Sequence, residues 1–180
     1  MNQKFIFAFI LLATFSMVNA TPHQFRKRGS LFNACSTTQA TQANTLSFNS
    51  FNVTINPDPL VAGAVESFNV FGTLNSDTSS STQLVILFTD SYQNLLAPPY
   101  IQQVNTPIKS GTQFSINAQQ VPAPAILPQD SLTYSISVIL GYPTSDMRQP
   151  LSIYGCASSG FQSDIYSVLG NSYPVAGNPF

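Results

Sequence analysis

Few side chains in this chain of 180 residues could catalyse a reaction, and the carboxylates are the first to consider. A closely spaced pair of carboxylates is the machinery of most glycoside hydrolases. The seven acids here are scattered along the sequence, and most fall in segments where we expect turns. We therefore expect them to cap and solvate the chain rather than to catalyse. They are Asp58, Glu66, Asp77, Asp90, Asp130, Asp146 and Asp164.

The N-terminus predicts a secretion signal. Lys4 supplies a positive charge, and Phe5 to Val18 is an apolar run too short to span a membrane. Small residues at Val18-Asn19-Ala20 suit cleavage, and the basic tripeptide Arg26-Lys27-Arg28 suits a processing protease. We expect a signal peptide at 1–20, a pro-segment at 21–28, a domain at 29–156 and a C-terminal tail at 157–180.

Processing after Arg28 would remove His23, which is the single histidine. Without histidine, neither a Ser-His-Asp triad nor a histidine-ligated zinc site can be built. The sequence also has no glycine-rich phosphate loop and no calcium-loop spacing. We therefore expect no enzymatic activity, no cofactor and no metal.

The processed chain would carry a net negative charge. Only Lys109 and Arg148 would remain against the seven acids, a net charge of 2 − 7 = −5. Nucleic-acid binding depends on a basic surface that neutralises phosphates. We expect no nucleic-acid partner.

Two cysteines, Cys35 and Cys156, are the whole complement of thiols. An even pair in a secreted chain predicts one disulfide. In the chain-entropy model, closing a loop of about 120 residues stabilises the fold by roughly 4–5 kcal/mol. The alternative, a reactive or metal-binding thiol pair, has no Cys-x-x-Cys motif to support it.

Alternation of apolar and polar residues recurs along the chain, with turn-forming clusters between the alternating runs. Phe51, Val53 and Ile55, for example, lie on one face of a run that stops at Pro57 and Pro59. The pattern predicts an all-β, immunoglobulin-like two-sheet antiparallel sandwich, with a closed barrel as the alternative. The expected strands cover 51–56, 68–74, 84–88, 100–104, 114–118, 132–140 and 151–156.

Two further features are local. Asn52-Val53-Thr54 is an N-glycosylation sequon whose Asn52 falls on the polar face of its strand, where a glycan would meet solvent. In the tail, Phe161, Ile165, Val168 and Leu169 stand at helical spacing before Gly170. This spacing predicts either one short amphipathic helix, which could act as a lid or membrane-touching flap, or a loosely ordered terminus.

Six stretches, read in order, are similar to a known family. They are INPDPLVAG (55–63), ESFNVFGTL (66–74), PIKSGTQFSI (107–116), VPAPAILP (121–128), YSISVILGYP (134–143) and Cys156. They resemble the ML (lipid-recognition) domain, and most closely the secreted fungal phosphatidylglycerol/phosphatidylinositol transfer proteins.

The resemblance implies a sandwich whose sheets are splayed apart to hold a single lipid, a phospholipid or a sterol, for transport between membranes. It implies a partner lipid and transient membrane contact. Lys109 could meet an anionic headgroup at the mouth of the lipid cavity. The cavity would be lined by Phe51, Val53, Phe68, Val70, Ile86, Phe88, Phe114, Ile116, Tyr134, Ile136 and Val138.

An ordinary filled core shows the same alternation. The alternative function is therefore a secreted adhesion or host-interaction module that uses the surface of the sandwich. Under either hypothesis we expect a secreted monomer, with the lumen of the secretory pathway or of the vacuole as a second location.

Overall fold

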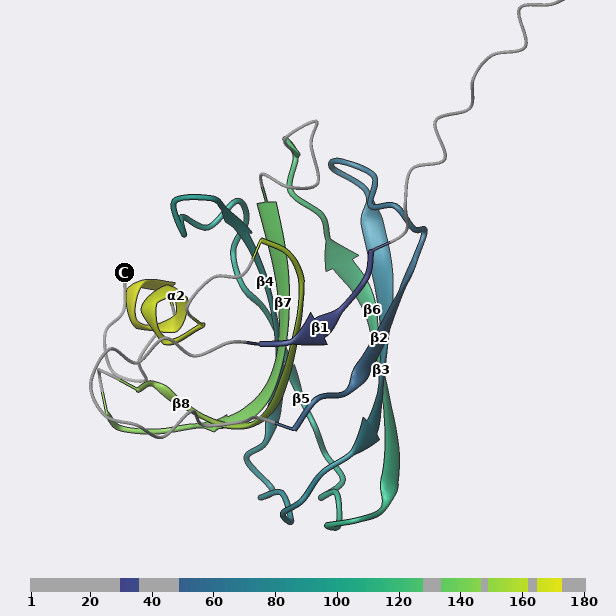
Figure 1. Ribbon diagram of the computed structural model, residues 1–180, viewed down its shortest axis with the longest axis vertical. Coiled ribbons are helices and arrows are strands. Elements are labelled where there is room, and N and C mark those ends of the chain that lie inside the picture. Colours follow the sequence, from purple (N-terminus) through teal and green to yellow (C-terminus); the bar gives the residue numbers. More distant parts are fainter. Residues whose placement is uncertain (1–29, 36–48, 128–133, 147–148, 162–164, 173–180) are drawn as a thin grey trace, which may run out of the picture.

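The computed structural model describes residues 30–35, 49–127, 134–146, 149–161 and 165–172. The expected signal peptide and pro-segment lie outside these residues, as do Asp130, Arg148 and Asp164. The described chain folds mainly into β-strands, with one helix (Figure 1). The elements are β1 (Asn33–Ala34), β2 (Asn52–Asn56), β3 (Val65–Thr73), β4 (Gln83–Asp90), β5 (Tyr100–Gln103), β6 (Gln113–Pro122), β7 (Tyr134–Pro143), β8 (Leu151–Gly160) and α2 (Ile165–Ser172).

The strands form two antiparallel sheets that face one another (Figure 1). One sheet has the order β1-β8-β7-β4-β5 and the other has the order β2-β3-β6. Strands distant in sequence are therefore neighbours in each sheet, as in an immunoglobulin-like sandwich. The predicted fold class is confirmed, and the closed barrel is wrong because the strands divide into two sheets.

Strands β3 and β6 are both longer than the alternation predicted. β3 begins at Val65, before the expected start at Phe68, and β6 continues to Pro122 instead of ending at Ala118. Gln120 has a positive φ of 58°, and the register between β3 and β6 shifts between Glu66 and Phe68. A bulge of this kind adds a residue to one strand, which breaks the period-2 pattern on which the sequence analysis depended.

The facing surfaces of the two sheets form one apolar core. Phe68 of β3 and Phe88 of β4 meet across the sheets, with ring centroids 6.3 Å apart and ring planes at 71°. Leu84 and Ile86 of β4 and Val70 of β3 are fully buried in the same cluster.

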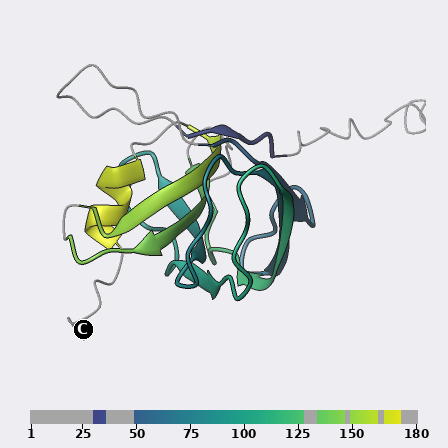
Figure 2. The same ribbon diagram turned by 90° about the horizontal axis from the view of Figure 1, so that it is seen from below.

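A second core lies on the outer face of the five-stranded sheet. Val85 and Leu87 of β4 and Ile139 of β7 point to this face, and Val168 and Leu169 of α2 cover them. Figures 1 and 2 show α2 on the side of this sheet that faces away from β2, β3 and β6. The strand at 84–88 is apolar on both faces because both faces are covered.

The start of the expected C-terminal tail is part of this packing. β8 continues past Cys156 to Gly160, and the helix predicted by the apolar spacing is present over Ile165–Ser172. The alternative of a loosely ordered terminus is wrong for these residues. Because α2 packs on the outer face, it does not cover the space between the sheets.

Candidate functional site

The structure brings all eleven predicted lining residues together on the facing surfaces of the sheets. Eight of them are buried in the inner core, namely Phe51, Val53, Phe68, Val70, Ile86, Phe88, Ile136 and Val138. The other three, Phe114, Ile116 and Tyr134, are partly buried and pack against it. Their shared position is now a structural fact, and their contact with a lipid stays a prediction.

Partly exposed side chains pack against the core on several sides, and three of them gather at one edge. Phe114 and Ile116 belong to β6, and Tyr100 of β5 is partly exposed beside the same core. β5 is one edge strand of the five-stranded sheet, and β6 is one edge strand of the three-stranded sheet. Inward apolar side chains therefore reach solvent along the β5–β6 edge.

Side chains, rather than a strand ladder, link the sheets at this edge. The Tyr100 hydroxyl donates to the Gln119 carbonyl oxygen at 3.2 Å, and the Gln102 amide donates to the Asn117 carbonyl oxygen at 3.5 Å. β5 and β6 belong to different sheets, so separating them breaks no backbone ladder. A net contribution of about 1 kcal/mol per hydrogen bond makes these links easy to exchange for water.

The opposite edge is held more firmly. The predicted disulfide between Cys35 and Cys156 is confirmed, and it fastens the N-terminal segment to β8. Just before β2, the Asn49 carbonyl oxygen accepts from the Cys156 N–H at 3.1 Å. The Asn49 amide also donates to the Tyr154 carbonyl oxygen at 2.9 Å. The disulfide lies within the five-stranded sheet, and the bonds of Asn49 link the segment before β2 to β8 across this edge. At the β5–β6 edge the links come from side chains.

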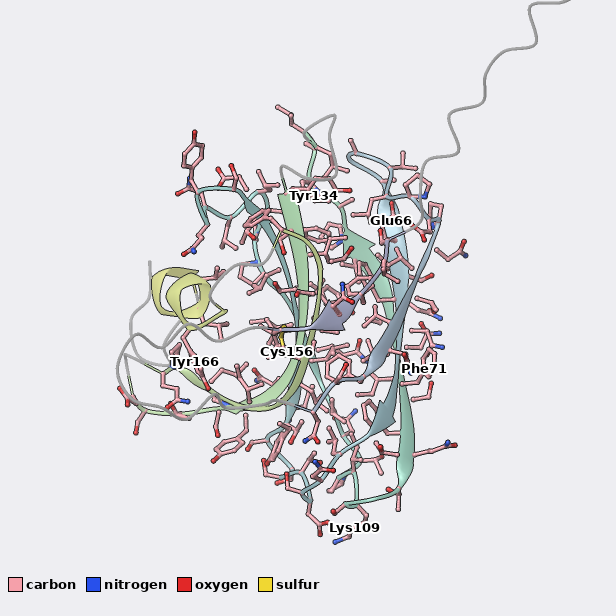
Figure 3. The ribbon with its side chains drawn as sticks, in the orientation of Figure 1. Glu66, Phe71, Lys109, Tyr134, Cys156 and Tyr166 are labelled. Carbon is pink, nitrogen blue, oxygen red and sulfur yellow. A yellow bond between two sulfur atoms is a disulfide. The ribbon has the colours of Figure 1, made fainter. Side chains whose placement is uncertain are left out.

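Lys109, the predicted headgroup residue, is exposed and already has a partner. Its ammonium lies 2.8 Å from an Asp77 carboxylate oxygen, and the Ser110 N–H donates to the other oxygen at 2.8 Å. The hydrogen bond from Lys109 lowers the pKa of Asp77, and the same bond raises the pKa of Lys109. Figure 3 shows Lys109 at the end of the sandwich opposite Tyr134 and Glu66.

Glu66 is a buried acid that the sequence analysis did not single out. It is 1% exposed, and it lies on the inward face of β3 because it alternates with Phe68 and Val70. One carboxylate oxygen accepts from the Val61 N–H at 2.9 Å, and the other is buried and has no hydrogen-bond partner among the described residues. The period-2 pattern of the strand, extended one step before Phe68, would have found it.

The end of the sandwich near Glu66 carries exposed apolar side chains. Gly63 N–H donates to the Pro124 carbonyl oxygen, so the loop before β3 lies against the loop after β6. On these two loops and the start of β3, Val61 is 50% exposed, Val65 is 60% exposed and Ile126 is 81% exposed. We call Val61, Val65 and Ile126 the apolar end.

Within the described residues, no group of three or more acids, cysteines or histidines could hold a metal ion. The described part of the chain also has no helix that is long and apolar enough to cross a membrane. Asn52 is exposed on β2, on the outward face where the sequon analysis placed it.

Comparisons with known proteins add little. No family model matches the chain, and no curated protein matches it. Among solved structures, one similar chain is chicken MD-1 in a crystal structure with lipid IVa. The two chains are 12% identical, the match covers 71% of this chain and 85% of that one, and the TM-score is 0.40. A likeness this remote carries no argument about the site.

Proposed function

We propose that this protein binds a single lipid between its two sheets and carries it between membranes. The observation that supports the proposal is the β5–β6 edge, where Phe114, Ile116 and Tyr100 of the inner surface are partly exposed. An interior that reaches solvent along an unpaired edge can admit an apolar chain.

Uptake would separate β5 from β6 while the disulfide edge stays closed. The hydrogen bonds from Tyr100 and Gln102 would exchange with water, and Phe114 and Ile116 would then contact the lipid. Burying hydrocarbon is worth roughly 0.8 kcal/mol per methylene, so a sixteen-carbon chain offers on the order of 12 kcal/mol before ordering costs. This is enough to offset a local separation of side chains.

Membrane contact would occur at the apolar end. Exposed apolar side chains grouped on adjacent loops are a feature of interaction surfaces. Lys109 is the one basic residue among the described residues, and it lies at the opposite end. The apolar end therefore suits a zwitterionic membrane surface better than an anionic one.

The finer parts of the proposal follow from the sequence. We infer a secreted monomer that acts without covalent chemistry and carries either a phospholipid or a sterol. A headgroup role for Lys109 would require an anionic lipid to compete with Asp77 for the ammonium group. The separation of Lys109 from the apolar end weighs against that role.

Native mass spectrometry of the purified protein, before and after incubation with phosphatidylcholine vesicles, tests lipid binding directly. Ile116→Glu places a carboxylate on the inner surface at a partly exposed position, and we expect it to reduce lipid uptake at least about tenfold. Gln113→Glu, on the outward face of the same strand, is the matched control and should bind normally.

Thermal unfolding of both variants distinguishes loss of binding from loss of fold. A wild-type protein that carries no lipid after purification and takes none from vesicles would rule out the carrier and favour the adhesion module. Equal lipid uptake by Ile116→Glu and Gln113→Glu would rule out the β5–β6 edge as the route.

A further inference from the structure

The carboxylate of Glu66 lies at one end of the inner core. Its Cα partner on β6 is Val121, which is fully buried in that core. Leu60 belongs to the same core, and it directly precedes Val61, whose N–H donates a hydrogen bond to Glu66. Figure 3 shows Glu66 at the same end of the sandwich as Tyr134, where β7 begins.

One carboxylate oxygen has a clear structural role. Oε1 accepts the Val61 N–H at 2.9 Å and so holds the loop between β2 and β3. Oε2 is buried, and no group in the described part of the chain forms a hydrogen bond with it. Leaving a buried acceptor unpaired costs free energy, and most buried polar atoms in folded proteins are paired for that reason.

The surroundings limit what could pair with Oε2. A carboxylate oxygen accepts hydrogen bonds, so its partner must be a donor. Among the described residues the one cation, Lys109, is at the far end and bound to Asp77. A phosphate or carboxylate headgroup offers acceptor oxygens, whereas a hydroxyl group offers the donor that Oε2 lacks.

We propose that Oε2 of Glu66 accepts a hydrogen bond from the hydroxyl group of the bound lipid. The inference rests on the proposed function and narrows it. The preferred ligand is an uncharged amphiphile with an apolar body between the sheets and a hydroxyl donor at the Glu66 end. An anionic phospholipid held through its phosphate does not fit this end of the core.

The proposal predicts a preference between two probes that differ in one donor. We compare 1-dodecanol with dodecyl methyl ether in competition against a fluorescent fatty-chain probe, using the full chain. Removing the hydroxyl group of the alcohol from water costs more free energy than removing the ether oxygen. Tighter binding of the alcohol therefore requires a hydrogen-bond acceptor in the protein. We expect wild-type protein to bind the alcohol about tenfold more tightly.

Glu66→Gln tests the acceptor itself. The glutamine side chain has the same shape and keeps an oxygen for the Val61 N–H, but it places a donor where Oε2 stands. An amide N–H can donate to the oxygen of either probe, so we expect the alcohol-to-ether ratio to fall to within about twofold. Asp146→Asn, on an exposed loop, removes the same charge and should keep the tenfold ratio.

The outcomes separate this inference from the function on which it rests. Equal binding of alcohol and ether by the wild-type protein, or an unchanged ratio in Glu66→Gln, would overturn the role of Glu66 and leave a lipid carrier. Failure of the wild-type protein to bind any lipid would overturn both. If Glu66→Gln does not fold, the wild-type comparison of the two probes still decides.

Discussion

At the scale of single residues, Tyr134 combines a lining position with a polar atom. It is partly buried at the start of β7 and packs against the inner core. Burial raises the pKa of its phenol, and the nearby Asp58 carboxylate raises it further. Both effects disfavour the phenolate in the folded protein, whereas the unfolded chain lets Tyr134 ionise at its ordinary value.

This difference predicts a loss of stability at alkaline pH. The unfolded chain releases the Tyr134 proton first, so the free energy of unfolding should fall as pH rises above about 10. Tyr134→Phe has no proton to release, and its stability should fall less over the same range. Urea unfolding between pH 8 and pH 11 measures this, with Tyr92→Phe, at an 85% exposed position, as the control. Parallel curves for wild type and Tyr134→Phe would contradict the assignment.

The sequence predicted the inward position of the apolar residues well and that of the buried acid among them poorly. Alternation assigns Val70 and Ile136 to the inward faces because side chains in a strand point to opposite faces in turn. Glu66 follows the same rule, yet an acid beside Ser67 and Asn69 gives no sign that a strand has begun. The Val61 N–H that meets its carboxylate comes from the loop before β3, and alternation within a strand does not predict that contact.

At the scale of elements, α2 stabilises the sandwich from outside. Leu169 is fully buried between α2 and the outer face of the five-stranded sheet. The helix is eight residues long, and a helix this short depends on packing for its stability. Its contacts lie on the other side of the sheet from the proposed lipid.

Leu169→Ala should therefore separate stability from lipid uptake. We expect the substitution to lower the free energy of unfolding by about 2–4 kcal/mol, because it leaves a cavity under α2. Lipid uptake, measured well below the unfolding temperature, should stay within about twofold of wild type, since the facing surfaces keep their packing. A large loss of uptake in a folded Leu169→Ala protein would show that α2 influences the interior.

The strands themselves were easier to predict than their partners. The turn at Pro57 and Pro59 and the alternation on either side give β2 and β3 from local rules. Local sequence patterns do not predict that β5 lies beside β6, which belongs to the other sheet. That edge arises because Tyr100 and Gln102 reach carbonyl groups of β6, contacts between segments far apart in the chain.

At the scale of the whole molecule, the two ends of the sandwich differ in character. One end has the exposed ion pair of Lys109 and Asp77. The other is the apolar end, where Ile126 is the most exposed of the three side chains. A carrier that meets membranes with the apolar end would insert these side chains among lipid headgroups. Substitutions at the apolar end should then change the rate of lipid transfer between membranes without changing the amount of lipid bound at equilibrium.

Ile126→Glu tests this difference. Loss of an inserted isoleucine should slow lipid transfer between phosphatidylcholine vesicles about tenfold, while the amount of lipid bound at equilibrium stays the same. Gln113→Glu adds an equal charge on a different part of the surface and should leave the transfer rate unchanged. A fluorescent lipid followed between donor and acceptor vesicles gives the rate. Equal rates for both variants would mean that the apolar end does not touch the membrane.

Strand β2 has a consequence for self-association. It is the edge strand of the three-stranded sheet on the side opposite β6, and such an edge invites another copy to add its own strand. β2 is only five residues long and stops before Pro57, which has no N–H to offer a neighbour. A sugar chain on the exposed Asn52 would be a bulky obstacle along the same strand. The β2 edge is thus poorly suited to fibre growth, which would help a protein that exposes apolar side chains at one end to stay dispersed.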